Sequence, residues 1–168
     1  MSDAWDAAIT FVLGIEGGYV NDPMDAGGET KYGISRRSYP HLDIASLTRD
    51  AAEKIYWEDY WAPLRCDQLP PALAVAVFDG GVNQGVPAAA RMLQLAVRVH
   101  ADGVIGPQTL NAAHGDSQGL SVPRFLAIRG VRYASTPGFD LYGVGWLGRL
   151  FQLQRVCLTV AGPGAAGL

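Results

Sequence analysis

Residues 15–35, IEGGYVNDPMDAGGETKYGIS, mark the point where an amphipathic helix gives way to a turn rich in glycine and acidic residues. The segment before it, residues 3–15, has the apolar periodicity of a helix, with one stripe formed by Trp5, Ala8, Ile9 and Val12. Ser2 or Asp3 can cap its start. Glu16 follows Val12 by four residues, so its side chain continues this stripe and is expected to point inward.

Glu16 is the first candidate for chemistry in this turn. Gly17 and Gly18 are expected to end the helix, which places Glu16 beside unpaired carbonyl groups that carry partial negative charge. Burial and this helix end both disfavour the ionised carboxylate, so we expect the pKa of Glu16 to be raised. A carboxylic acid that is protonated near neutral pH can act as a general acid at a glycosidic oxygen. The alternative is a last-turn residue that points into solvent.

Further carboxylates follow Glu16 closely. Asp22, Asp25, Glu29 and Thr30 lie among glycines and a proline, a composition that predicts a small β-hairpin rather than a helix. A hairpin that folds back over the helix end would bring a second carboxylate near Glu16. Two carboxyl groups that flank a bond, one protonated and one ionised, are the usual requirement for glycoside hydrolysis. The alternative role of Asp22 and Asp25 is to form Asx turns.

An apolar helix with a polar end is expected to begin at Pro70 or Pro71. It is apolar on nearly every side, which is typical of a central helix. Asn83 and Gln84 at its end can line a groove and hydrogen-bond the N-acetyl and hydroxyl groups of a sugar chain. The alternative is that Asp79 and Asn83 cap backbone groups or brace the hairpin.

Aromatic residues are candidates for sugar stacking because their rings present large apolar faces. Tyr19, which directly follows the glycines, is the stronger candidate for this role. Tyr56 and Tyr60 lie on one face of a helix that is expected to be capped by Thr48 and to end near Trp61. Their helical spacing favours a place in the core.

Several motifs together resemble the glycoside hydrolase family 108 muramidases, which are bacterial and phage lysozymes. They follow the order and spacing of that family across about residues 3–155. The motifs are EGGYVNDPMDAGGETKYGIS from Glu16, SLTRDAAEKIYWEDYW from Ser46, LPPALAVAVFDGGVNQG from Leu69, LQLAVRVHADGVIGPQTL from Leu93 and GWLGRL from Gly145. The resemblance implies a mainly α, lysozyme-like helical fold with a small β-hairpin after the first helix, forming two lobes.

For the site, the resemblance implies that Glu16 of the EGGY element is the catalytic acid. The wider lysozyme superfamily suggests a Glu, Asp, Thr arrangement around a hairpin, which corresponds to Glu16, Asp25 and Thr30. Asp25, or Asp22 in its place, would activate water or stabilise the positive charge on the sugar ring. Thr30 would position that water.

The expected division of the chain is a catalytic lobe at residues 1–86, a helical lobe at 87–161 packed on it, and a flexible tail at 162–168. In the second lobe, residues 102–109, DGVIGPQT, look like the turn of small peptidoglycan-binding helical modules. The alternative is an Asp-Gly turn followed by a proline at a helix start. Helices are expected from Pro87 to about Val99, from Pro107, from Ser121, and from Gly143 to Val160.

Composition excludes several other classes of protein. A length of 168 residues can bury a substantial core, and a net charge of −3 without a basic stripe argues against nucleic acid as a partner. The longest apolar runs are far below the roughly 20 residues that span a bilayer, and the N-terminus lacks the basic residues of a signal peptide. Cys66, Cys157 and the three dispersed histidines show no metal-ligand spacing, so no metal or cofactor is expected.

These features predict an endolysin-type lysozyme that hydrolyses the β-1,4 bond between N-acetylmuramic acid and N-acetylglucosamine. Its partners would be peptidoglycan glycan strands. We expect a cytoplasmic monomer that a holin or a secretion system releases to the cell wall or periplasm. Two alternatives stay open: a lytic transglycosylase that uses Glu16 alone, and a noncatalytic wall-binding or phage structural module.

Overall fold

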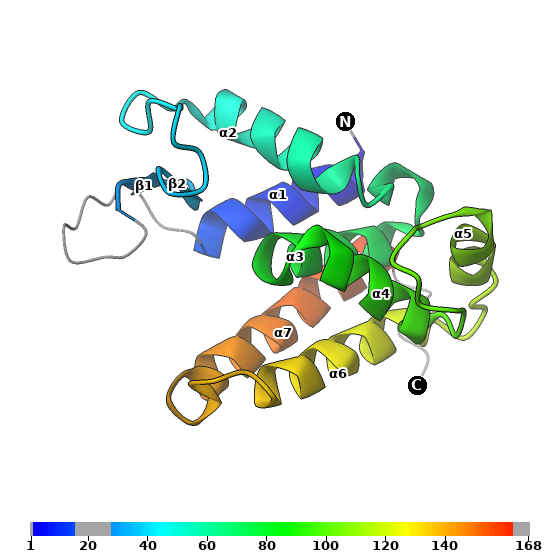
Figure 1. The fold of residues 1–168 in the computed structure, drawn as a ribbon. Coiled ribbons are helices and arrows are strands. Elements are labelled where there is room, and N and C mark those ends of the chain that lie inside the picture. Colours follow the sequence, from blue (N-terminus) through cyan, green and yellow to red (C-terminus); the bar gives the residue numbers. More distant parts are fainter. Residues whose placement is uncertain (1, 16–27, 163–168) are drawn as a thin grey trace.

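The computed structural model describes residues 2–15 and 28–162, and helices dominate this part of the chain (Figure 1). This confirms the mainly α fold with a small hairpin after the first helix. The elements are α1 (Asp3–Ile15), the strands β1 (Thr30–Lys31) and β2 (Ile34–Ser35), α2 (Arg49–Tyr56), a π-helical turn (Trp57–Trp61), a 3-10 turn (Cys66–Gln68), α3 (Pro71–Gln84), α4 (Val86–Ala96), α5 (Pro107–His114), α6 (Ser121–Ala134) and α7 (Phe139–Ala161).

Helix α1 packs as its sequence predicts. The four residues of the apolar stripe, Trp5, Ala8, Ile9 and Val12, are all buried, and their exposed fractions do not exceed 3%. The hydroxyl of Ser2 accepts a hydrogen bond from the backbone N–H of Trp5 at 3.3 Å, so Ser2 caps the helix start. The stripe packs α1 against α3. The last described residue of α1 is Ile15.

The hairpin is short and tightly turned. Its two strands pair antiparallel, with Thr30 opposite Ser35 and Lys31 opposite Ile34. Tyr32 and Gly33 connect them with φ angles of 54° and 75°, and positive φ at both central residues is the signature of a type I′ turn. Ile34 is 2% exposed, so it fixes one face of the hairpin to the core.

Helix α2 begins where predicted but does not stay α-helical. Thr48 caps it by accepting a hydrogen bond from the N–H of Ala51 at 3.2 Å. The chain then continues to Trp61 through the π-helical turn, whereas the sequence predicted a single α-helix. This turn places the rings of Trp57 and Trp61 at 4.9 and 5.2 Å from the ring of Trp5. Packing of three large rings therefore accompanies the wider turn.

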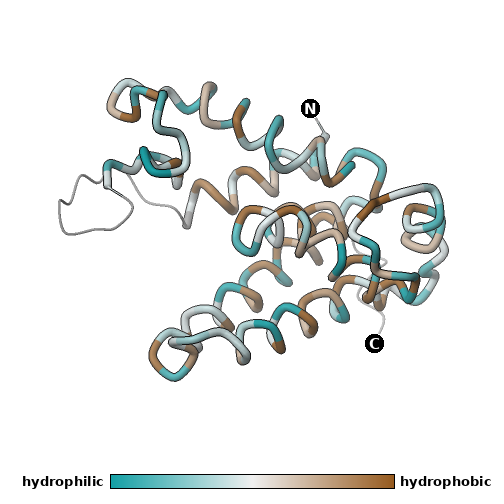
Figure 2. The backbone as a smooth tube through the Cα atoms, viewed as in Figure 1, coloured by the Kyte–Doolittle hydropathy of each residue, from teal (hydrophilic) through white to brown (hydrophobic). Residues whose placement is uncertain are grey.

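Helix α3 is the centre of the molecule, in contact with α1, α4, α6 and α7 (Figure 1). It begins at Pro71, and every residue from 73 to 81 is buried. Gly80 and Gly81 permit the close packing, because a Cβ atom on them would lie 2.8 Å from Phe125 and 2.5 Å from Leu64. Figure 2 shows the hydrophobic residues of α3 giving way to hydrophilic ones at its C-terminal end.

The C-terminal helices differ from the predicted ones in two boundaries. Helix α4 ends at Ala96, before the predicted Val99, because Arg98 adopts a left-handed conformation with φ 62°. Helix α7 begins at Phe139, four residues before the predicted Gly143. Gly138, with φ 87°, ends the preceding turn, and the helix starts directly after it.

The turn at residues 102–109 is held by one buried side chain. Gln94 of α4 is 1% exposed, and its Nε2 donates to Asp102 Oδ1 at 2.6 Å. Its Oε1 accepts from the N–H of Gly103 at 2.8 Å. The hydrogen bond from Gln94 lowers the pKa of Asp102. The segment is thus a braced turn, and its predicted role in wall binding stays a prediction.

Candidate active site

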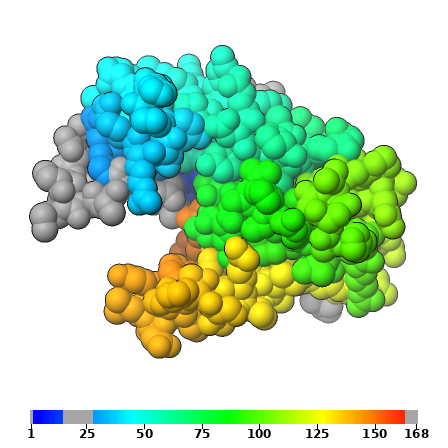
Figure 3. All heavy atoms as spheres, viewed as in Figure 1, coloured from blue at the N-terminus to red at the C-terminus, as the bar shows by residue number. Residues whose placement is uncertain are grey.

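A broad recess opens at the C-terminal end of α3. Figure 3 shows it between the hairpin on one side and the turn that joins α6 to α7 on the other. Two cavities in this recess share Asn83, the penultimate residue of α3. In Figure 1, the described end of α1 lies beside the hairpin at the same side of the molecule. Elements from both halves of the chain therefore border the recess.

The first cavity has a volume of about 200 Å³ and lies under the hairpin. Tyrosine side chains form much of its wall. Tyr56 is held in place because its hydroxyl donates to the carbonyl of Tyr32 at 2.9 Å. The hydroxyl of Tyr39 donates to Asp59 Oδ2 at 2.6 Å, and burial together with this hydrogen bond raises its pKa, so it stays protonated. The lining residues are Gly33, Ile34, Ser38, Tyr39, Tyr56, Tyr60, Val82 and Asn83.

This cavity modifies the prediction for two aromatic residues. Tyr56 is 3% exposed and belongs to the core, as its spacing favoured. Tyr60 is half-buried and packs against the core. Both rings also line the cavity, so they serve the core and the recess at once.

The second cavity, of about 310 Å³, lies between the end of α3 and the start of the α6–α7 turn. Asn83 is exposed, and its Oδ1 accepts a hydrogen bond from the hydroxyl of Tyr133. Gln84 Oε1 accepts from Arg129 Nε at 3.1 Å. The side chains that line this cavity are Asn83, Gln84, Arg132, Tyr133, Thr136 and Trp146.

A buried ion-pair cluster lies beneath this cavity. Asp79, which is 1% exposed, accepts from Arg129 Nη1 at 2.7 Å and from Arg149 Nη2 at 2.7 Å. The cluster joins α3, α6 and α7. One alternative expected from the sequence was that Asp79 and Asn83 cap backbone groups or brace the hairpin. Among the described residues, Asp79 binds the two arginines and Asn83 binds Tyr133. A buried carboxylate needs a counter-charge, and the C-terminal half supplies it.

The predicted catalytic residues are described only in part. Glu16, Tyr19, Asp22 and Asp25 lie outside the described residues, and their roles stay predictions. Thr30 begins β1, and its hydroxyl donates to the carbonyl of Gly28 at 3.2 Å. It lines neither of the two cavities.

Asn83 and Gln84 are the predicted binding residues that the structure brings together. Both line the second cavity, and Asn83 also lines the first. The same residues have intramolecular partners on α6, so each side chain both lines the recess and accepts a hydrogen bond from α6 through its amide oxygen.

Sequence reasoning missed four contributors from the C-terminal half, namely Arg129, Tyr133, Trp146 and Arg149. A signal for two of them exists. Residues 125–134, FLAIRGVRYA, place Arg129 four positions before Tyr133 within an apolar stretch, so both share one helix face. A buried arginine there requires an acidic partner, and Asp79 required a basic one. The sequence alone does not pair the two, since 50 residues separate them.

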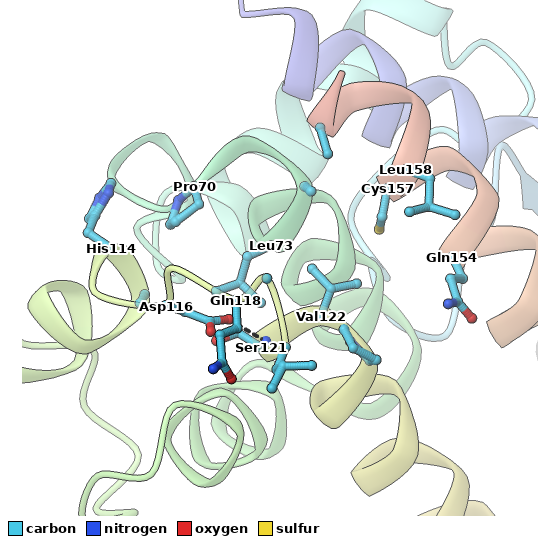
Figure 4. Close-up of a pocket in the computed structure, with 16 residues that line it drawn as sticks. Pro70, Leu73, His114, Asp116, Gln118, Ser121, Val122, Gln154, Cys157 and Leu158 are labelled. Carbon is cyan, nitrogen blue, oxygen red and sulfur yellow. Dashed lines mark hydrogen bonds between the residues drawn. The ribbon is translucent and has the colours of Figure 1, made fainter. Parts of the chain in front are cut away.

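A further pocket, of about 370 Å³, lies at the other end of α3, between α5, the start of α6 and the end of α7 (Figure 4). Its walls include Leu73, Val122 and Leu158. Its carboxylate, Asp116, accepts from the backbone N–H of Ser121 at 2.5 Å, which fixes the loop before α6. A mostly apolar pocket with a carboxylate engaged in this way is poorly suited to acid–base chemistry on a glycan.

The described part of the chain offers neither a metal site nor a membrane-spanning helix. No three His, Cys, Asp or Glu side chains in it could jointly hold a metal ion. None of its helices combines the length and apolar character needed to cross a membrane. Cys66 and Cys157 are free and buried, and burial raises the pKa of both thiols, that of Cys157 to about 12.

Similarity to known proteins extends over the elements that border the recess. Residues 9–85 match the family model described as Glycosyl hydrolase 108. Among solved structures, the chain is similar to SagA of Brucella abortus, with 30% sequence identity over 96% of this chain and 97% of that chain and a TM-score of 0.85. No curated protein sequence matches it.

Proposed function

This chain belongs to glycoside hydrolase family 108 and is a glycosidase that degrades peptidoglycan, and we propose that it cleaves the β-1,4 bond between N-acetylmuramic acid and N-acetylglucosamine. The observation that carries this proposal is the recess at the end of α3. It presents tyrosines and side-chain amides on its walls (Figure 3), and the described end of α1 lies on the same side of the molecule as the hairpin (Figure 1). The residue after Ile15, where the description of α1 stops, is Glu16.

In the proposed mechanism Glu16 protonates the oxygen of the leaving sugar. Asp25 activates water or stabilises the positive charge that develops on the sugar ring. Thr30 positions that water: its hydroxyl proton goes to the carbonyl of Gly28, so its oxygen can still accept a hydrogen bond from a water molecule. These roles follow from the sequence and the family; of the three residues, the structure describes Thr30 alone.

Substrate binding in this proposal uses the walls of the recess. Asn83 and Gln84 hydrogen-bond the acetamido and hydroxyl groups of the glycan. Tyr19 supplies a face for a pyranose ring. We assign Trp146 the same stacking role in the second cavity, because it is half-buried and lines that cavity.

The products distinguish this proposal from its rivals. Purified peptidoglycan is incubated with the protein, loss of turbidity is followed, and the released fragments are analysed by mass spectrometry. A hydrolase yields fragments with a reducing N-acetylmuramic acid end. A lytic transglycosylase, which would use Glu16 alone, yields 1,6-anhydro ends that are lighter by one water. A noncatalytic module leaves turbidity and glycan length unchanged, and either of the last two results would overturn the proposal.

The second carboxylate can be assigned by a pair of matched variants. Asp25→Asn is expected to lower turnover more than Asp22→Asn, because Asp25 lies nearer the GGET turn and matches the superfamily spacing. Each change keeps the side-chain shape and removes the charge. Initial rates of peptidoglycan hydrolysis for the two variants decide between them. An inactive Asp22→Asn beside an Asp25→Asn of normal rate would reverse the two roles.

A further inference from the structure

A directed chain of hydrogen bonds runs from the buried ion-pair cluster to the recess. Arg129 is 0% exposed and donates through all three of its nitrogen atoms. Nη1 donates to Asp79 Oδ2 at 2.7 Å, Nη2 to the hydroxyl oxygen of Tyr133 at 3.1 Å, and Nε to Gln84 Oε1 at 3.1 Å. Tyr133 in turn donates to Asn83 Oδ1. The chain ends at two side-chain amides.

The direction of this chain is fixed by chemistry. An arginine has N–H donors and no acceptor, so the oxygen of Tyr133 must accept from Arg129. The single proton of Tyr133 is then available for Asn83 Oδ1. The opposite orientation of the Asn83 amide would leave the proton of Tyr133 without an acceptor among the described residues. Asn83 therefore turns its oxygen inward and its NH₂ group outward.

Gln84 is oriented in the same way. Its Oε1 accepts from Arg129, so its NH₂ group is the end that remains for the recess. No residue in the described part of the chain accepts a hydrogen bond from Asn83 Nδ2 or Gln84 Nε2. Both side chains line the second cavity. The end of α3 thus offers the cavity two amide donors, and both acceptor oxygens are turned away.

We propose that Arg129 and Tyr133 are positioning residues that make the end of α3 donor-only, and that Asn83 and Gln84 thereby select glycans carrying the carbonyl oxygen of an N-acetyl group. The inference rests on the proposed function and adds a basis for its substrate preference. A carbonyl oxygen is purely an acceptor and matches two fixed donors. The protonated amine of a de-N-acetylated sugar is purely a donor and is rejected by the same wall. A sugar hydroxyl group can both donate and accept a hydrogen bond, so it can bind the same two amides.

The test uses purified peptidoglycan glycan strands before and after chemical de-N-acetylation. The measured quantity is the ratio of kcat/KM for the N-acetylated to the de-N-acetylated strands. A ratio within one enzyme preparation does not depend on the fraction of folded protein, so a merely structural defect would not move it.

Asn83→Asp is the sharpest variant for this test. The carboxylate still accepts from Tyr133, but an acceptor oxygen replaces the outward NH₂ group. The preference for N-acetylated strands is expected to fall by about 10-fold or more, since a hydrogen bond to the acetamido oxygen is replaced by a contact between two acceptor oxygens.

Tyr133→Phe tests the positioning role. It removes the proton that orients Asn83 and leaves the side chain of Asn83 chemically unchanged. We expect the ratio to fall by about 3- to 10-fold, mainly through KM on N-acetylated strands. Tyr142→Phe is the matched control: Tyr142 is 57% exposed on α7 and lines neither cavity of the recess, and the change removes its hydroxyl while keeping the ring that stacks on Trp146 at 6.0 Å. Its ratio should equal that of the wild type.

The outcomes separate this inference from the proposed function. If the wild type hydrolyses peptidoglycan and neither Asn83→Asp nor Tyr133→Phe changes the ratio, the donor-only wall is wrong and the proposed function stands. If the wild type hydrolyses neither substrate, the proposed function is wrong. The inference is then decided by calorimetric affinities for the two kinds of strand, where an equal affinity of the wild type for both overturns it.

Discussion

Replacement of Glu16 by Gln is expected to reduce peptidoglycan hydrolysis by about 10²-fold or more, because general-acid catalysis typically contributes at least that factor. The amide has nearly the shape of the carboxylic acid but cannot transfer a proton to the leaving oxygen. The initial rate of turbidity loss, with the reducing ends counted independently, measures the effect. Retention of more than a tenth of the wild-type rate would rule out Glu16 as the catalytic acid.

Glu58→Gln provides the control for this experiment. Glu58 lies in the π-helical turn with its side chain 59% exposed, and its contact with Lys54 spans 3.8 Å at the surface. The same chemical change there should leave the rate within a factor of about two, since exposed pairs contribute little. A comparable loss in both variants would point to a general effect of the added amide rather than to a catalytic role.

The expectation that burial and the negative end of α1 raise the pKa of Glu16 rests on the sequence, because Glu16 lies outside the described residues. Among the described residues, Arg149 of α7 places its guanidinium carbon 5.7 Å from the ring centre of Phe11 in α1. The same guanidinium pairs with Asp79 at 2.7 Å. The sequence could not show these contacts, because Arg149 comes from a distant helix.

Features set by local interactions were predicted well from the sequence. The stripe of α1 repeats at helical spacing, Thr48 caps its own helix, and Pro71 occupies a first helical position where its missing N–H costs nothing. The uninterrupted apolar run of α3 predicted a central helix, and α3 is central. Each of these signals acts within a few residues, which is why one sequence suffices to read it.

Features that depend on contacts between distant segments were not predicted. The π-helical turn at residues 57–61 accompanies packing of its tryptophan rings on α1. The partners of Asp79 are 50 and 70 residues away in the sequence. The recess itself is bordered by the hairpin, α3 and the α6–α7 turn, so its second wall comes from the half of the chain in which no site residue was predicted.

Asp79→Asn is expected to lower the free energy of unfolding by roughly 3–5 kcal/mol, the usual cost of removing one partner from a buried ion pair. The variant keeps the shape of the side chain and removes its negative charge. Arg129, which is fully buried, would lose the carboxylate that balances its charge at 2.7 Å. The loss is a large share of the roughly 5–15 kcal/mol that stabilises a typical domain. Urea denaturation at pH 7 measures it directly.

Glu53→Gln makes the same chemical change in a surface pair and serves as the control. Glu53 pairs with Arg49 one helical turn away at 2.7 Å, and the arginine side chain is 58% exposed. The expected loss there is below about 1 kcal/mol, because solvent screens the pair and can replace it. Equal losses in the two variants would show that the Asp79 cluster is no stronger than a surface contact. A large loss confined to Asp79→Asn would show that the cluster joining α3, α6 and α7 holds together the helices that carry Asn83 and Tyr133 at the recess.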